Sequence, residues 1–358
     1  MIYYILILNA LRYRKAMRNM GDNKKSCPMH KTSIGGQAVI EGVMMRGPKK
    51  IATAVRKPDG EITIDEQSLG KVRTGKFVKL PIIRGCVNFF DSMIVGVKSL
   101  MYSAQFFDVD EEGEPIEQEP SKFEAWLEKK LDSEKATNAV IYISVIFSLL
   151  LSVGLFMLLP AFLTGLIKDV VTSQAILALI EGIIRIVIFL VYLAAVSQMK
   201  DIKRVFMYHG AEHKSIFCYE KGLDLTVENV RKQSRLHPRC GTSFLLIVMV
   251  ISILVFSIIP WDKDKFAMIP FIGQYLAALP WVVTRLFFRL LLLPIVAGIS
   301  YEIIKFAGRH DNAFTHAISK PGMWFQHITT NEPDDSQIEV AIASLKVVIP
   351  ENADEDKW

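Results

Sequence analysis

The sequence has few cysteines and places none of them in a paired spacing. Its 358 residues include four, Cys27, Cys86, Cys218 and Cys240, and no CxxC pattern occurs. All four fall in segments that we assign below to the cytoplasmic side, where thiols stay reduced. This pattern excludes a disulfide framework.

The sequence also lacks a basic stripe and an internal repeat. The formal net charge is +5, but the lysines and arginines are scattered. A concentrated stripe is the usual footprint of nucleic-acid binding, so we expect no nucleic-acid partner and interpret the excess as a determinant of membrane orientation. The absence of a repeat and of a pair of broken helices argues against an independent transporter.

Hydrophobic residues, in contrast, are abundant and unevenly distributed. They make up 51% of the chain, and the mean hydropathy is +0.29. Residues 20–135 and 310–358 resemble water-soluble sequence, whereas residues 138–306 hold nearly all the long apolar runs. The sequence therefore predicts an α+β membrane protein in contact with the lipid bilayer, with about four transmembrane helices and a small cytoplasmic β-rich domain.

Four apolar segments are candidates for these helices: about 138–165, 174–197, 243–260 and 281–306. At a rise of about 1.5 Å per residue each can cross an apolar core of about 30 Å, although the third is short. Lysines and arginines concentrate before the first segment and between the second and third. The positive-inside rule then places both termini and the 198–242 loop in the cytoplasm of a bacterial cytoplasmic-membrane protein.

The rest of the chain divides into shorter segments. Residues 1–30 form an N-terminal extension, either an interfacial anchor or an extension from an early start codon. Residues 31–84 form the β-rich domain, 108–137 an acidic linker and helix, and 138–306 the transmembrane domain that includes the 198–242 loop. Residues 307–358 form a C-terminal segment that we expect to dock on the β-rich domain.

Residues 85–107 are apolar but interrupted by Asn88, Asp91 and Lys98. This pattern favours an amphipathic helix lying on the membrane or on the β-rich domain. A fifth span is the alternative.

The β-rich domain contains one clear hairpin signal and a glycine-rich segment. Pro58, Asp59 and Gly60 form a turn signal between two β-type runs. The preceding stretch, GGQAVIEGVMMRGP, has four glycines, which we interpret mainly as tight turns. The alternative is a substrate cradle that uses Glu41 and Arg46, but the spacing matches neither a P-loop nor GxGxxG.

The strongest chemical signal is YHGAEHKSIFCYE, which follows the second apolar segment. A helix would place His209 and His213 on one face, with Glu212 beside them. H-x-x-E-H is the spacing of the inverzincin metalloproteases, in which two histidines bind zinc and the glutamate acts on water. The alternative is a surface helix face with an internal ion pair.

A further ligand is available in HPRCGTSF, just before the third apolar segment. If only one of His237 and Cys240 binds, the centre has three protein ligands and an open, catalytic position. If both bind, the shell is closed and the site is structural. The alternative is a turn in which Cys240 packs as a small hydrophobe. We favour a zinc site.

Charged residues also occur inside the apolar segments. Glu181 and Arg185 are four residues apart in the second segment, and Arg289 of the fourth lies at a similar depth. Since isolated charges are costly there, we predict a Glu181–Arg185–Arg289 cluster and favour a structural clamp over a transport path.

Glu302 lies near the inner end of the fourth segment, close to the level of His209 and His213. It is a candidate metal ligand or second-shell partner. A surface pair with Lys305 or Arg309 is the alternative.

Together with GISYEIIKFAG and PGMWFQHITTNEPDDSQIEVAI, these motifs resemble the YqhQ-like bacterial membrane proteins over residues 31–350. That family has no known function and is often labelled as predicted metal-dependent enzymes. The resemblance implies metal-site roles for the HGAEH and HPRCG residues, His209, Glu212, His213, His237 and Cys240, but supplies no activity.

Two functions fit the sequence. The first is a zinc-dependent hydrolase at the cytoplasmic membrane face, with Glu212 as general base. The second is a non-enzymatic scaffold, or an accessory factor for membrane-protein biogenesis or transport, which binds a membrane-protein partner. The sequence indicates no oligomeric state.

Overall fold

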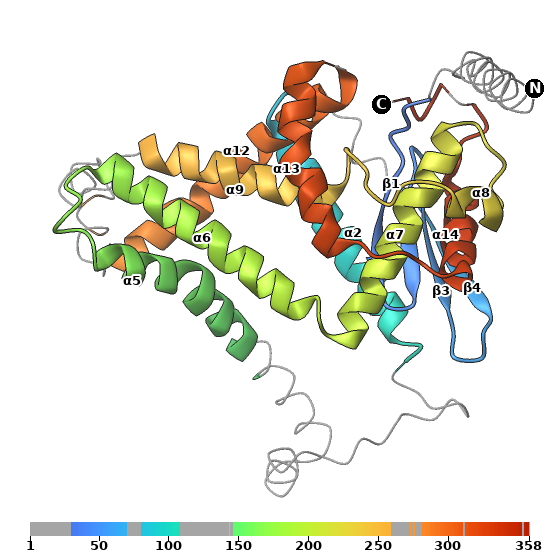
Figure 1. Cartoon of the computed structure of the whole chain (residues 1–358), viewed down its shortest axis with the longest axis horizontal. Helices are drawn as coiled ribbons and strands as arrows, with labels where there is room; N and C mark the ends of the chain where they lie inside the picture. The colour runs from blue at the N-terminus through green and yellow to red at the C-terminus, as the bar shows by residue number, and fades with distance from the viewer. Residues whose placement is uncertain are drawn as a thin grey trace, which may run out of the picture.

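The computed structural model of the chain describes residues 30–69, 80–107, 146–258, 281–310, 312–352 and 354–357, together with residues 143, 273, 275 and 279. The predicted extension at 1–30, except for His30, and the acidic linker and helix at 108–137 lie outside the described residues. Long apolar helices form one end of the molecule, and a sheet with its covering helices forms the other (Figure 1).

A four-stranded antiparallel sheet forms the core of the second part. Its strands are β1 (Gly35–Val39), β2 (Gly42–Arg46), β3 (Lys50–Arg56) and β4 (Ile62–Ser68), in the order β1-β2-β3-β4. The turn between β3 and β4 is the predicted one: Asp59 accepts a hydrogen bond from the Glu61 N–H at 2.8 Å, and Gly60 has φ 88°.

Helices cover both faces of this sheet. On one face α7 (Lys200–Glu220), α8 (Val227–Arg231) and α14 (Asp335–Val348) enclose a buried apolar core. On the other face, α2 (Ile83–Ala104) approaches β3, where the Thr53 hydroxyl donates to Ser99 Oγ at 3.1 Å. Thr53 and the core residues Ala52 and Ala54 point to opposite sides because side chains alternate along a strand.

The apolar part contains α5 (Leu159–Gly165), which continues a π-helical turn at Gly154–Leu158, together with α6 (Gln174–Val196), α9 (Gly241–Ile258) and α12 (Trp281–Arg309). Among the described residues, three helices are long and apolar enough to cross a membrane: Ile146–Gly165, Ala175–Val196 and Phe287–Arg309. The predicted third span is a shorter apolar helix, Phe244–Ser257, within the described residues. These findings indicate a membrane protein; its fourth crossing stays a prediction.

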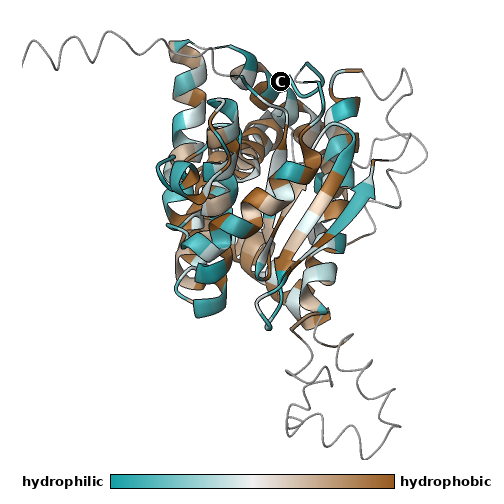
Figure 2. Ribbon diagram, turned by 90° about the vertical axis from the view of Figure 1, so that its right-hand side faces the viewer, coloured by the Kyte–Doolittle hydropathy of each residue, from teal (hydrophilic) through white to brown (hydrophobic). Residues whose placement is uncertain are grey.

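Surface polarity differs between the two parts. Apolar side chains such as Phe147, Leu150 and Val191 are each 64% exposed, as expected of helices that face lipid. Seen from the sheet end, the outer helices carry many hydrophilic residues, and the strands include both hydrophobic and hydrophilic ones (Figure 2).

A further helix, α13 (Ala313–Thr329), lies where the two parts meet (Figure 1). It begins with a capping box in which Asn312 and Thr315 bond each other's backbone N–H. It packs against α9 and α12, and its last turn reaches α7. This position lets α13 supply contacts to the site described next.

Candidate metal centre

Helix α7 places His209, Glu212 and His213 together in the interior. The two imidazole ring centroids are 4.4 Å apart, as expected for residues one turn apart. All three side chains are buried, and His213 is only 1% exposed. The H-x-x-E-H face therefore does not form a solvated helix surface.

Cys240, at the turn into α9, joins this pair. Its Sγ lies 3.2 Å from His209 Nε2. The donor atoms of His209, His213 and Cys240 all lie within 4.8 Å of one another. A tetrahedral zinc ion with Zn–N of about 2.0–2.1 Å and Zn–S of about 2.3 Å holds its donors roughly 3.3–3.7 Å apart. The group is therefore close to the dimensions of a metal shell.

Backbone carbonyls orient both imidazoles. His209 Nδ1 lies 2.8 Å from the carbonyl oxygen of Thr329, at the end of α13. His213 Nδ1 lies 2.5 Å from the carbonyl oxygen of Arg235. A carbonyl only accepts, so each Nδ1 is the donor, and each ring turns its Nε2 toward the donor group as the atom that would bind a metal.

Two buried polar atoms at the group have no hydrogen-bond partner within the described part of the chain. They are His213 Nε2 and Glu212 Oε2, and the latter lies 4.0 Å from His209 Nε2. Leaving such an atom unpaired costs about 1–3 kcal/mol. A cavity of about 80 Å³, lined by Gly36, Glu212, His213 and Cys240 among others, adjoins them and is large enough for water. These features fit a bound cation with a water molecule.

The backbone of Gly36 in β1 closes one side of this cavity. A Cβ at this position would lie 2.6 Å from the Met44 carbonyl oxygen and 3.0 Å from two side-chain carbons of Glu212. Of the alternative cradle residues, Glu41 pairs with Arg204 at the start of α7. The glycine-rich segment thus reaches the site through close backbone approach at Gly36.

Arg46, the other residue of that alternative, pairs with Asp91 of α2. Its side chain is therefore engaged with α2 rather than with the cavity.

Electrostatics favours the metal-binding form of the thiol. Burial acts to raise the pKa of Cys240, but the adjacent imidazoles of His213 and His209 hold it well below its ordinary value. Burial acts to lower the pKa of His209, yet the Cys240 sulfur outweighs it and raises that pKa to about 9. The site therefore holds a thiolate, which is the form that binds metals.

Glu212 behaves differently from an exposed carboxylate. Burial raises its pKa, although His213 and His209 act in the opposite direction. A carboxylate with a raised pKa is a stronger base than an exposed one.

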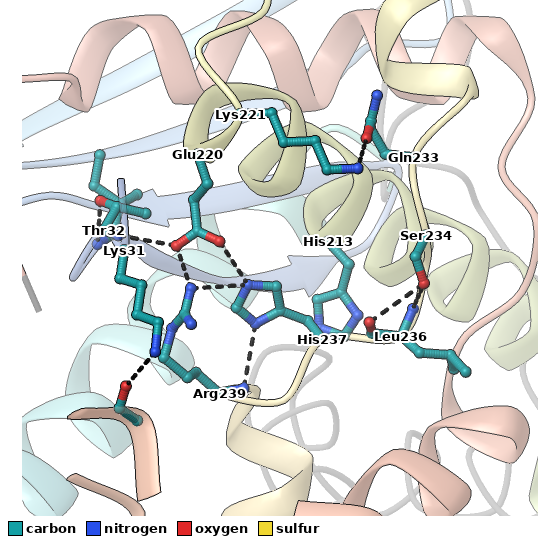
Figure 3. A network of polar contacts seen from close by, with 12 residues as sticks. Lys31, Thr32, His213, Glu220, Lys221, Gln233, Ser234, Leu236, His237 and Arg239 are labelled. Atoms are coloured by element: carbon teal, nitrogen blue, oxygen red, sulfur yellow. Dashed lines mark hydrogen bonds and ion pairs between the residues drawn. The ribbon is translucent and has the colours of Figure 1, made fainter. Parts of the chain in front are cut away.

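His237 belongs to a neighbouring network rather than to the His–His–Cys group (Figure 3). Its Nε2 lies 3.6 Å from Glu220 Oε2, and Glu220 also pairs with Arg239 and accepts from the Thr32 N–H at 2.9 Å. Burial lowers the pKa of His237 to about 4, so the ring is neutral. Of the two predicted ligands in the HPRC motif, the structure brings only Cys240 into the group.

Glu302 pairs with α2. Arg84 of α2 donates to both of its carboxylate oxygens, at 2.6 Å for the Nε contact. This bidentate pair engages the carboxylate, so its role beside His209 and His213 stays a prediction. The alternative partners, Lys305 and Arg309, do not form this pair.

The three intramembrane charges lie together, remote from the metal group in the chain's apolar part. Arg185 and Arg289 each donate to Glu181 Oε1 at 2.7 Å. Arg185 Nε also donates to the Phe156 carbonyl at 3.0 Å, within the π-helical turn. The contacts join the π-helical turn before α5 to helices α6 and α12, which is consistent with a clamp.

Several contributors at the site were not singled out from the sequence. Glu220 and Arg239 lie inside the two recognised motifs, so their chemistry was visible there. Thr242, whose N–H lies 3.4 Å from Cys240 Sγ, was also within a motif. The carbonyls of Thr329 and Arg235 left no sequence signal, because any residue supplies a carbonyl.

Comparison with known proteins gives a family but no activity. The family described as "Protein of unknown function (DUF1385)" matches residues 80–351. The chain is 35% identical over 326 residues to "Uncharacterized protein YqhQ" of Bacillus subtilis (strain 168), an alignment that covers 88% of this chain and 92% of that protein. No solved structure matches the chain. The chain belongs to the DUF1385 family.

Proposed function

We propose that this protein is a zinc-dependent hydrolase whose centre lies at the cytoplasmic face of the membrane. One observation carries the proposal: a buried His209–His213–Cys240 donor group with the unpaired Glu212 carboxylate oxygen beside it. The centre directly precedes α9 in sequence, so a substrate would come from the membrane boundary or a juxtamembrane peptide. Amide and ester bonds are the substrate class.

The donor set favours zinc over harder cations. Imidazole and thiolate ligands suit zinc, whereas magnesium and calcium prefer oxygen ligands. Three protein ligands leave a fourth position open, which is typical of catalytic rather than structural zinc sites. His209, His213 and Cys240 would hold the ion, with Thr329 and Arg235 fixing the two rings.

Each remaining residue then has a defined task. A bound zinc ion would supply Lewis-acid polarisation and an acidified water. Glu212 would take the proton from that water at Oε2 and hold it for the leaving group. Gly36 keeps the space at the Glu212 side chain free, since any larger residue would displace it.

Metal analysis of the detergent-purified protein tests the ligand assignment. We expect about one zinc per chain in the wild type and near-complete loss in His213→Ala and Cys240→Ala. Cys218→Ala is the matched control, because Cys218 is a buried cysteine of α7 outside the donor group. Equal zinc content in all four proteins would refute the site.

Glu212→Gln tests the hydrolase assignment separately. We expect this variant to retain zinc and to fail to complement a deletion phenotype. The glutamine carboxamide has nearly the same size as the carboxylate but cannot accept the proton. We therefore expect the rate of hydrolysis to fall about 10²-fold or more.

The scaffold function is the second candidate, and burial is the observation that favours it. The adjoining cavity is only about 80 Å³, and His213 is almost inaccessible. A structural zinc site would explain both. Full complementation by Glu212→Gln together with failure of His213→Ala would favour the scaffold over the hydrolase.

A further inference from the structure

We infer that a second cavity, between the end of α6 and the last turn of α13, binds the phosphate group of an anionic lipid. Its volume is about 350 Å³, and its polar lining comes from Ser197, Gln198, Lys203, His327 and Asn331. None of these residues belongs to the proposed metal centre. The inference therefore goes beyond the proposed hydrolase and does not depend on it.

The lining offers positive charge that the described residues leave unused. Lys203 Nζ and the His327 ring have no ion-pair or hydrogen-bond partner within the ranges that the structure describes. Both side chains are exposed. A phosphate oxygen is an ideal acceptor for an ammonium group and for imidazole N–H, because such charge-assisted bonds are short and strong.

The amide groups at the cavity are partly engaged, which fixes its walls. The Gln198 side chain donates to the Ala194 carbonyl at 3.3 Å, and the Asn331 side chain donates to the Lys203 carbonyl at 3.3 Å. The Asn331 N–H also donates to the Phe206 carbonyl at 2.8 Å. The cavity is therefore preformed between the end of α6, the start of α7 and the segment after α13.

Its position favours a lipid as the carrier of the phosphate. The candidate span Ala175–Val196 ends at the cavity, so the cavity lies where lipid headgroups meet the protein. Trp324 of α13 is 63% exposed and precedes His327 by three residues, so it lies about one turn from the cavity. Exposed tryptophan next to basic side chains is typical of a helix at the membrane interface.

The size of the cavity supports the same source. About 350 Å³ is far more than a bare phosphate ion fills, and it suits a phosphate esterified to a larger headgroup. By the positive-inside orientation this is the cytoplasmic leaflet, where clustered basic residues attract anionic lipids.

Native mass spectrometry of the detergent-purified full chain, titrated with phosphatidylglycerol, tests this inference. We expect phosphatidylglycerol to bind and phosphatidylcholine to bind more weakly. Lys203→Ala should lower phosphatidylglycerol affinity about fivefold, and the Lys203→Ala/His327→Ala double variant about tenfold or more. A separate titration with inorganic phosphate at the same concentration distinguishes binding of a lipid from binding of free phosphate.

Matched controls are available at two other exposed positions. Lys168→Ala removes an exposed lysine beyond the other end of α6, and His316→Ala removes an exposed histidine of α13; both should bind as the wild type does. Equal binding by the wild type and the double variant would overturn the inference, as would equal affinity for the two lipids. Variant-sensitive binding of inorganic phosphate without lipid binding would overturn the lipid assignment.

Discussion

At the residue scale, the close approach of Gly36 to the Glu212 side chain gives a direct test of how the cavity is shaped. We expect Gly36→Ala to lower the free energy of unfolding by about 1–3 kcal/mol, because its methyl group would press on the Met44 carbonyl and the Glu212 side chain. Zinc content and complementation should fall with it. Chemical denaturation and metal analysis of the purified variant measure the two effects.

Gly35→Ala is the adjacent control. A Cβ there meets no atom within 4 Å, so stability and metal content should match the wild type. If the two alanine variants behaved alike, close packing of β1 against Glu212 would not be what shapes the cavity.

Sequence spacing predicted part of this site for a simple reason. His209 and His213 lie one helical turn apart, so any helix through them places both on one face. The choice between His237 and Cys240 could not be made in this way. It depends on Glu220 and on Gln326, whose amide bonds both the N–H and the carbonyl of His237 at 2.7 Å, and these contacts are tertiary.

Glu302 is a residue whose partner sequence spacing could not predict. Counting along the helix could not give the direction of its side chain. Arg84 is distant in sequence, and its approach depends on how α2 packs on α12. Linear spacing contains no information about such a pair.

At the scale of single elements, the N-terminus of α14 offers a test with a defined pH dependence. Burial acts to raise the pKa of Asp334, but bonds from the Ser336 hydroxyl and the Gln337 N–H outweigh it and hold the pKa below its ordinary value. The unfolded chain therefore takes up a proton first as the pH falls. The stabilisation by Asp334 is present above about pH 3.8 and is lost below it.

Two substitutions distinguish the helix-capping hydrogen bonds of Asp334 from the effect of its negative charge. Asp334→Ala should cost about 1 kcal/mol at neutral pH. Asp334→Asn should retain most of the stability there and lose less of it between pH 4 and pH 2. Denaturant titrations at several pH values measure this, and identical acid sensitivity of the Asn variant and the wild type would contradict the assignment.

The intramembrane cluster gives a second prediction for elements. Glu181→Gln would leave the guanidinium groups of Arg185 and Arg289 around a neutral amide. Because removing the carboxylate charge that both guanidinium groups contact is costly in an apolar region, we expect a loss on the order of 3 kcal/mol. Thermal unfolding in detergent should show a lower midpoint than Lys168→Gln, a loop control; equal midpoints would argue against a clamp.

Element types were predictable where local chemistry decides them. The Pro58–Asp59–Gly60 turn specifies the β3–β4 hairpin, since Gly60 adopts positive φ. The apolar length of α6 likewise marks a candidate span. The α9 helix is harder, because Phe244–Ser257 is short for a bilayer core of about 30 Å.

At the scale of the whole molecule, the packing of the sheet part bears on whether α9 crosses the membrane. Helices α7 and α14 share one apolar core, so the segments before and after the pair α9 and α12 must lie on one side of the membrane. We expect α9 to cross together with α12. Alkaline phosphatase fused after Lys168 should be active outside, and green fluorescent protein fused at the C-terminus should fluoresce inside. A dark C-terminal fusion with phosphatase activity there would contradict this topology.

At the joint between the two parts, the His–His–Cys group lies close in sequence to two apolar helices. Helix α7 follows α6 almost at once, and Cys240 directly precedes α9. The site is thus held between the sheet, through Gly36, and two apolar helices. Movement of the sheet domain relative to the membrane would change the distance between the α7 histidines and Cys240.

Zinc K-edge X-ray absorption of the detergent-purified full chain tests the central claim most directly. The account predicts one sulfur at about 2.3 Å and nitrogen or oxygen ligands at about 2.0–2.1 Å, with the sulfur lost in Cys240→Ser. A protein without zinc, or a wild-type zinc shell that contains no sulfur, would contradict it.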